Sequence, residues 1–221
     1  MRIILTTSPN DNLIPFDYQK YLIGVLHKWL GDNEIHDNIS LHSFSWLKNG
    51  KHEGEGLNFR NGSMWSINFH KEKYIRRIIE SILKDPSMFH GMQVIDIQID
   101  SPRSWEKGEY HFRMASPILI KRTIDYNSIK FYTYEDVECG ALMTETLKNK
   151  MDVAGLPKDE TLSVEFDMNY YNRKIKLVDI HGIKNKCSMC PIIIKGKSDS
   201  IEFARNVGIG NSTGSGFGAI Y

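Results

Sequence analysis

The C-terminal segment Asn206–Tyr221 contains the residues whose types and spacing most directly suggest chemistry. It carries Gly208, Gly210, Gly214, Gly216 and Gly218, interleaved with Asn211, Ser212, Thr213 and Ser215. Glycine permits positive φ and lets a phosphate approach bare N–H groups, and short hydroxyl and amide side chains add donors. We therefore predict a loop that holds a phosphodiester. The alternative, a flexible glycine-rich tail, is disfavoured because apolar residues from Phe217 to Tyr221 give the segment something to bury.

The position of these glycines argues against the common nucleotide folds. A dinucleotide-binding fingerprint needs a helix and a full βαβ unit after its glycines, and only Ala219–Tyr221 follow here. A Walker loop needs Gly-Lys-Ser/Thr, and no Lys or Arg occurs after Arg205. We expect neither fold.

Histidine is the second residue type of interest, because its pKa of about 6.5 suits proton transfer near neutral pH. His27 lies in a segment with apolar residues at helical spacing, about 180° from the centre of the apolar stripe at 100° per residue. It shares the exposed face with Lys20, Ile23 and Gly24. On these grounds His27 is either a solvated histidine or a functional one.

Composition limits the classes of function. The net charge is +1 and the pI is about 7.7, so a nucleic-acid site must be a local patch. Lys121, Arg122 and Arg205 are the basic residues predicted to contact such a ligand, and aromatic residues such as Tyr170 and Tyr171 can stack bases. No apolar run suits a signal peptide or a membrane span, so we expect a cytoplasmic protein that does not bind membranes.

The 3 cysteines suggest a reducing compartment rather than disulfides. Cys187 and Cys190 have zinc-knuckle spacing, but no second Cys or His pair stands at a matching distance. His42 is expected to face solvent or a groove rather than a metal. We predict no metal site and no cofactor.

The elements that must position these residues alternate in a regular order. The first half predicts strands and helices as β-α-β-β-α-β, the ferredoxin-like arrangement. The ranges are 2–7, 17–30, 41–47, 63–69, 71–84 and 92–99, with a turn-rich connection at 49–56. The second half repeats the plan loosely, with strands at 112–121, 130–134, 161–168, 174–180 and 191–195 and helices at 135–151 and 198–207. Strands 161–168 and 174–180 are expected to pair. The fold class is thus α+β with two tandem ferredoxin-like domains, 1–104 and 105–221.

Three landmarks together resemble the CRISPR-associated endoribonucleases that process precursor CRISPR RNA, in the repeat-associated mysterious protein (RAMP) superfamily. The first is the glycine-rich loop from Gly208 to Gly218. The second is Phe112-Arg-Met-Ala-Ser-Pro-Ile-Leu-Ile120, similar to the Ser-Pro-aliphatic segment that opens the family's second half. The third is the N-terminal pattern Ile14-Pro-Phe-Asp-Tyr-Gln-Lys-Tyr-Leu-Ile-Gly-Val-Leu-His27.

The resemblance implies two tandem ferredoxin-like domains and RNA cleavage without metal inside the CRISPR repeat. It implies that His27, on the first helix, and His36, in the following loop, do the proton transfers. The family's lysine usually follows the loop histidine by a few residues, where this chain has Ile39, Ser40 and Leu41. Lys48 or Lys51 could supply that charge, or two histidines could suffice.

The resemblance therefore implies a repeat endoribonuclease that leaves 2′,3′-cyclic phosphate and 5′-hydroxyl ends, as a hydrolase-class nuclease in crRNA maturation and antiviral defence. The expected partner is CRISPR repeat RNA or precursor crRNA, and a homodimer or association with other CRISPR effector subunits is compatible with this hypothesis. The alternative is a non-catalytic subunit that binds repeat RNA. A ferredoxin-like protein that binds an anionic metabolite explains less.

Overall fold

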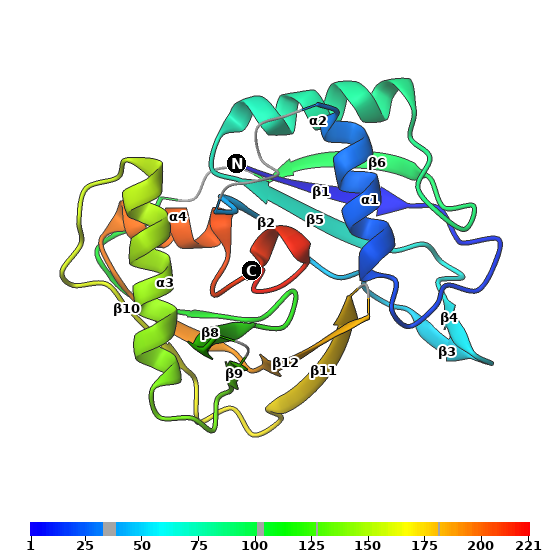
Figure 1. The fold of residues 1–221 in the computed structure, drawn as a ribbon. Coiled ribbons are helices and arrows are strands. Elements are labelled where there is room, and N and C mark those ends of the chain that lie inside the picture. Colours follow the sequence, from blue (N-terminus) through cyan, green and yellow to red (C-terminus); the bar gives the residue numbers. More distant parts are fainter. Residues whose placement is uncertain (33–38, 101–103, 127, 181) are drawn as a thin grey trace.

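The computed structural model describes residues 1–32, 39–100, 104–126, 128–180 and 182–221. Two α+β units follow one another along the chain (Figure 1). The first consists of β1 (Arg2–Thr7), α1 (Gln19–Leu30), β2 (His42–Phe44), β5 (Met64–Phe69), α2 (Glu72–Lys84) and β6 (Val94–Asp100), with a hairpin of β3 (Lys51–Glu53) and β4 (Gly56–Asn58) inserted after β2. These bounds lie within a few residues of the predicted ranges, and the connection at 49–56 holds most of the inserted hairpin.

The strands of the first unit form an antiparallel sheet in the order β2-β5-β1-β6. The first and third strands of the β-α-β-β-α-β unit are therefore central, and β6 is the outermost strand beside β1. Ile3 and Leu5 point from β1 into the core that α1 and α2 cover. α1 forms because Leu22, Val25 and Leu26 recur at helical spacing, and all three are buried.

The second unit repeats this plan with two insertions. Its elements are β7 (Gly108–Phe112), α3 (Cys139–Ala154), β10 (Ser163–Phe166), β13 (Ile192–Gly196), α4 (Ser198–Val207) and the short 3-10 helix η1 (Thr213–Ser215). The inserted hairpins are β8 (Ile120–Asp125) with β9 (Ser128–Tyr132), and β11 (Lys174–Ile180) with β12 (Ile183–Met189).

The second sheet has the order β10-β13-β7, and Ile220 bridges Met114 just beyond β7. The last residues of the chain therefore occupy the place of a fourth strand. The expected fold class, tandem ferredoxin-like units, is confirmed.

Two predicted features of the second half are wrong. β10 pairs with β13, and β11 pairs with β12, so the expected pairing of 161–168 with 174–180 does not form. The predicted strand 112–121 is divided, because β7 ends at Phe112 and β8 begins at Ile120. The missed strand β12 alternates lysines with small polar residues, which conceals its strand character.

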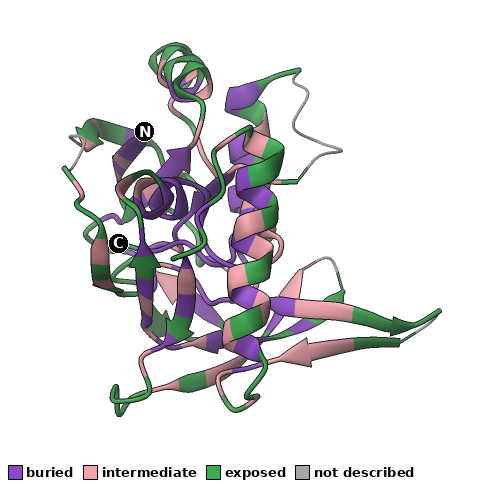
Figure 2. Cartoon of the chain, turned by 90° about the vertical axis from the view of Figure 1, so that its left-hand side faces the viewer, coloured by how far each residue is buried: buried purple, intermediate pink, exposed green. Residues whose placement is uncertain are grey.

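Each unit has its own core, and the chain termini join them. The first core draws on residues between Ile3 and Val94, and the second on residues between Phe112 and Ile220. Figure 2 shows buried positions gathered in the interior and exposed positions on the outward turns of the helices. At the junction, the Arg2 guanidinium donates to the carbonyls of Arg205 and Ile220, at 3.3 and 2.6 Å. The exact domain boundary stays a prediction.

Candidate functional site

The glycine-rich segment is a folded loop between α4 and the end of the chain, packed against the first unit. Gly208, Gly210, Gly216 and Gly218 all have positive φ, between 65° and 86°. A Cβ on Gly218 would lie 1.8 Å from the Ile209 carbonyl oxygen. These four glycines are buried, so close backbone packing explains them at least as well as ligand contact.

The Ser116-Pro117 motif anchors this loop. The Ser116 hydroxyl accepts a hydrogen bond from the Ala219 amide at 2.9 Å, and the Pro117 carbonyl accepts one from the Gly218 amide at 2.8 Å. The Ile209 amide in turn donates to the Gly218 carbonyl at 2.8 Å. Two of the sequence landmarks, far apart in the chain, thus form one structural unit.

The accessible part of the loop is its tip, where Asn211, Ser212, Gly214 and Ser215 are half-exposed. The Asn211 side-chain oxygen accepts hydrogen bonds from the Lys121 amide at 2.9 Å and from Arg122 Nη1 at 3.4 Å. The structure therefore brings the predicted residues Lys121 and Arg122 to the loop tip. Arg122 also pairs with Glu145 at 3.2 Å, which offsets part of its charge.

A buried lysine supports the tip from below. Lys150, on α3, is 3% exposed. Its Nζ donates to Thr213 Oγ1 at 2.9 Å and to the Val207 carbonyl at 3.3 Å. Burial lowers the pKa of Lys150 to about 7, whereas the two oxygen acceptors favour the protonated form. In its protonated form, Lys150 places a positive charge directly beneath η1.

His42, on β2, closes the other side of the tip. It is buried and stacks on Phe69, with ring centroids 4.5 Å apart and planes 5° from parallel. A Cβ on Gly214 would lie 2.8 Å from the His42 ring, so glycine is required for the loop to lie against this histidine. Burial, and then the charges of Lys150 and His27, lower the pKa of His42 to about 3. His42 is therefore neutral at physiological pH, and the expectation that it faces solvent or a groove is wrong.

His27 is half-buried on α1, and α1 contacts η1. The charge of His27 contributes to the lowered pKa of His42, after burial and the charge of Lys150. His27, on the face of α1 predicted to be exposed, is thus partly covered. His36 lies outside the described residues, so its place relative to His27 stays a prediction.

Arg205 has a different setting from the other predicted basic residues. It is 2% exposed, and its guanidinium bonds to the Asp100 carboxylate at the junction of the two units. Because that group is occupied inside the protein, we do not include Arg205 in the proposed RNA surface.

Sequence reasoning missed Lys150, although a signal was present. Met143, Leu147 and Lys150 occupy one stripe of α3 at helical spacing, and the two apolar members are fully buried. A lysine on a buried stripe must find acceptors or lower its pKa, and either outcome makes it a candidate site residue.

A separate groove, rich in cationic side chains, lies beside the C-terminal residue Tyr221. Its cavity of about 590 Å³ is lined by Arg113, Lys174, Lys176, Tyr170, Tyr171 and Tyr221 among others. Lys48 Nζ lies 4.5 Å from the Tyr221 ring centroid, and Lys176 Nζ lies 5.6 Å from that of Trp46. The Trp46 indole donates to the Gly216 carbonyl at 2.8 Å, so the groove is joined to the glycine loop.

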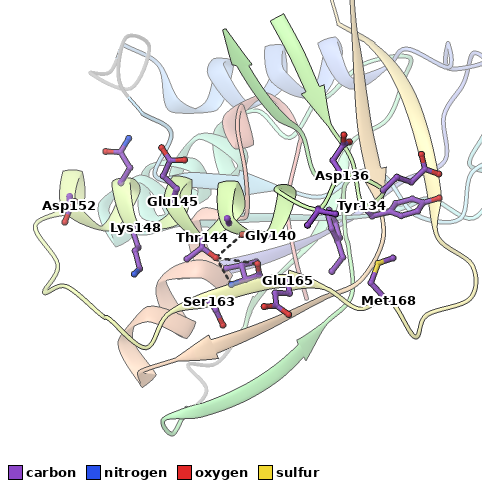
Figure 3. A pocket seen from close by; sticks show the side chains of 16 residues that line it. Tyr134, Asp136, Gly140, Thr144, Glu145, Lys148, Asp152, Ser163, Glu165 and Met168 are labelled. Carbon is purple, nitrogen blue, oxygen red and sulfur yellow. Dashed lines mark hydrogen bonds between the residues drawn. The ribbon is translucent and has the colours of Figure 1, made fainter. Parts of the chain in front are cut away.

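A further cavity, of about 980 Å³, lies elsewhere, between α3 and β10 (Figure 3). Its lining includes several carboxylates and one lysine: Glu135, Asp136, Glu145, Asp152, Glu165 and Lys148. This excess of negative charge repels a polyanion. The cavity is therefore a poor place for a nucleic-acid backbone.

Within the described parts of the chain, no three His, Cys, Asp or Glu residues gather as metal ligands would. Cys187 and Cys190 are buried, and burial raises their pKa values to about 12 and about 11. They therefore remain protonated thiols in the second unit. No described helix is both long and apolar enough to cross a membrane.

Comparison with known proteins identifies the fold and the family. Residues 99–221, which carry the Ser-Pro motif, Lys150 and the whole glycine loop, match the family model described as CRISPR associated protein Cas6, C-terminal. The chain belongs to the Cas6 family. It is therefore a CRISPR-associated protein, as the sequence landmarks predicted.

Solved Cas6 and RAMP structures share the fold over almost their whole length. A Cas6-related protein from Pyrococcus furiosus superposes with a TM-score of 0.85 at 20% identity, covering 100% of this chain and 97% of that one. A structure described as an RAMP protein binding different RNA substrates has a TM-score of 0.84 at 20% identity, covering 100% and 98%. A Thermus thermophilus Cas6 product complex has a TM-score of 0.72 at 10% identity, covering 99% and 98%. A search of curated protein sequences gives no match.

Proposed function

We propose that this Cas6 family member binds CRISPR repeat RNA at the glycine loop and cleaves it without a metal ion. The observation that carries the proposal is the position of the loop tip. Its polar residues 211–215 lie beside α1, which bears His27, and above the buried ammonium of Lys150. A site of this kind combines a phosphate-binding backbone with a proton-transfer group and a supporting amine that is positively charged when protonated.

The proposed reaction is attack of a ribose 2′-oxygen on the adjacent phosphorus. A base removes the 2′-OH proton, the bond from phosphorus to the 5′-oxygen breaks, and an acid protonates that leaving oxygen. The products carry 2′,3′-cyclic phosphate and 5′-hydroxyl ends. We assign the two proton transfers to His27 and His36, because these residues match the positions of the family's proton-transfer residues. We assign stabilisation of the phosphorane to the N–H groups of the loop tip.

Lys150 is suited to supporting the loop. It is not suited to replace the family's lysine that usually follows the loop histidine and is absent from this chain at that position. Its ammonium is buried and already bonded to Thr213, so it can attract a bound phosphate only through the loop. Lys121, with its backbone bonded to Asn211, is the proposed direct contact to the RNA backbone at the tip.

The remainder of the RNA strand is proposed to follow the cation-rich groove beside Trp46. Single-stranded nucleic acid is bound by positive charges along its backbone and aromatic rings against its bases. The groove offers both, since Tyr171 is 92% exposed and Lys174 and Lys176 line the same cavity.

Cleavage of repeat RNA in excess EDTA tests the assignment. His27→Ala should slow single-turnover cleavage by about 100-fold or more, because positioned proton transfer contributes roughly 10²–10⁴-fold. His111→Ala is the matched control, since His111 is an exposed histidine on β7, and it should cleave at the wild-type rate. Equal rates for His27→Ala and wild type would remove His27 from the mechanism.

A non-catalytic RNA-binding protein is the second candidate. It is favoured by the burial of His42 and Lys150 beneath the loop, because a substrate cannot reach the His42 imidazole or the Lys150 amine. Tight binding of repeat RNA with no cleavage by the wild-type protein would select this alternative.

A further inference from the structure

The outer edge of β6 is an unpaired strand edge, remote from the glycine loop. Hydrogen bonds join Met1 to Phe69 and Thr7 to Ser63, so odd-numbered residues of β1 direct their backbone groups toward β5. Ile97 lies opposite Leu5, and Ile99 lies opposite Ile3. The amides and carbonyls of Ile97 and Ile99 therefore point away from β1, and no described strand pairs with them.

An apolar surface accompanies this edge. Ile97 and Ile99 are on the core face of the sheet, as are their partners Leu5 and Ile3, but Ile99 is 55% exposed and neighbouring Ile95 is 66% exposed. On α2, Leu83 is 77% exposed. These residues line a groove of about 480 Å³ between α2 and β6. Figure 1 shows β6 as the outermost strand, alongside α2.

We propose that this edge pairs with β6 of a second copy of the chain, which joins the two four-stranded sheets into one. A two-fold axis through Ile97 places each Ile97 opposite its counterpart as a hydrogen-bonded antiparallel pair. Ile95 of each copy then lies opposite Ile99 of the other, and the apolar side chains of both copies share one face. This is an isologous interface formed by strand addition.

Charge selects this register over its neighbour. With the axis at Ile97, Asp96 lies opposite Gln98 of the second copy, and an amide can donate to a carboxylate. With the axis one residue further along, at Gln98, Asp96 would lie opposite Asp100 of the second copy, and like charges directly opposite destabilise a pair. Asp100 is bonded to Arg205 within its own chain, which offsets part of its charge, but its carboxylate still offers Asp96 no hydrogen-bond donor in that register. The strand is thus self-complementary in the first register.

The proposed dimer leaves both RNA sites open. The glycine loop contacts β2, which is the opposite edge of the same sheet from β6. The interface therefore does not depend on the proposed cleavage, and each can fail without the other.

Sedimentation velocity over a wide concentration range tests the dimer. The wild-type protein should reach twice the 25.5 kDa mass of the chain. Ile95→Lys with Ile99→Lys should remain a monomer with unchanged repeat RNA binding. The control pair, Ile124→Lys with Ile129→Lys, alters isoleucines of similar exposure on β8 and β9 and should still dimerise. A wild-type monomer at all concentrations, or a dimer of the β6 variant, would overturn the proposal.

A cross-link tests the register and does not require the lysine variant to fold. Asp96→Cys protein and Gln98→Cys protein, mixed and mildly oxidised, should form a disulfide-linked dimer. Neither variant alone should do so. The absence of a cross-link in the mixture, or a cross-link from Gln98→Cys alone, would contradict the register centred on Ile97.

Discussion

At the scale of single residues, the buried side chain of Lys150 beneath the glycine loop should make the stability of the protein depend on pH. Burial holds its pKa at about 7 rather than 10.5. Between these pH values the unfolded chain binds a proton that the native chain does not, so the free energy of unfolding rises with pH. We predict that Lys150→Met reduces this rise between pH 7 and 10.5, as measured by urea denaturation at a series of pH values.

The control for that experiment is Lys148→Met, on the same helix but with a half-exposed side chain paired with Glu160. It should retain the wild-type pH slope. If Lys150→Met and wild type have the same slope, Lys150 is protonated in the native protein throughout this range, and its charge beneath the loop persists to high pH.

At the scale of elements, the glycine loop depends on residues that lack a Cβ. Gly218 has a φ of 65° and no room for a methyl group, whereas Gly155, at the end of α3, has a φ of 74° and nothing within 4 Å. Left-handed backbone alone costs an L-residue about 1–2 kcal/mol. We predict that Gly155→Ala loses about this much stability and that Gly218→Ala loses clearly more, as measured by chemical denaturation. Equal losses would show that the loop relaxes around the added methyl group.

Some elements could be predicted from the sequence because their patterns are local. The apolar spacing in α1 and the alternation in β1 each point to one structure, and both formed near the expected bounds. Strand pairing in the second unit could not be predicted, because β12 has little apolar alternation and its pairing with β11 depends on the hairpin between them.

The candidate site was predictable only in part, for the same reason. The glycines and Ser116-Pro117 are visible as motifs, but their hydrogen bonds link residues about a hundred positions apart. The packing of Gly214 against His42 has no local signal at all. The positive-φ glycines of the loop are buried, so the half-exposed polar tip between them, and not the glycines themselves, is the part that can contact a ligand.

At the scale of the whole molecule, the proposed site draws on both ferredoxin-like units. The first unit contributes α1 and β2, and the second contributes the loop, Lys150 and Lys121. The contacts of Arg2 with Arg205 and Ile220 hold these parts together from both ends of the chain. Neither unit alone brings the loop tip against α1, so the proposed activity depends on the junction of the two units.

The most direct test of the central claim compares two repeat RNAs under excess EDTA. One is all ribose, and the other has a single 2′-deoxynucleotide immediately before the cut. We predict cleavage of the first to 2′,3′-cyclic phosphate and 5′-hydroxyl ends, and no cleavage of the second at that position. Cleavage of the 2′-deoxy substrate, or loss of activity toward the ribose substrate on chelation, would contradict metal-independent attack by the 2′-oxygen.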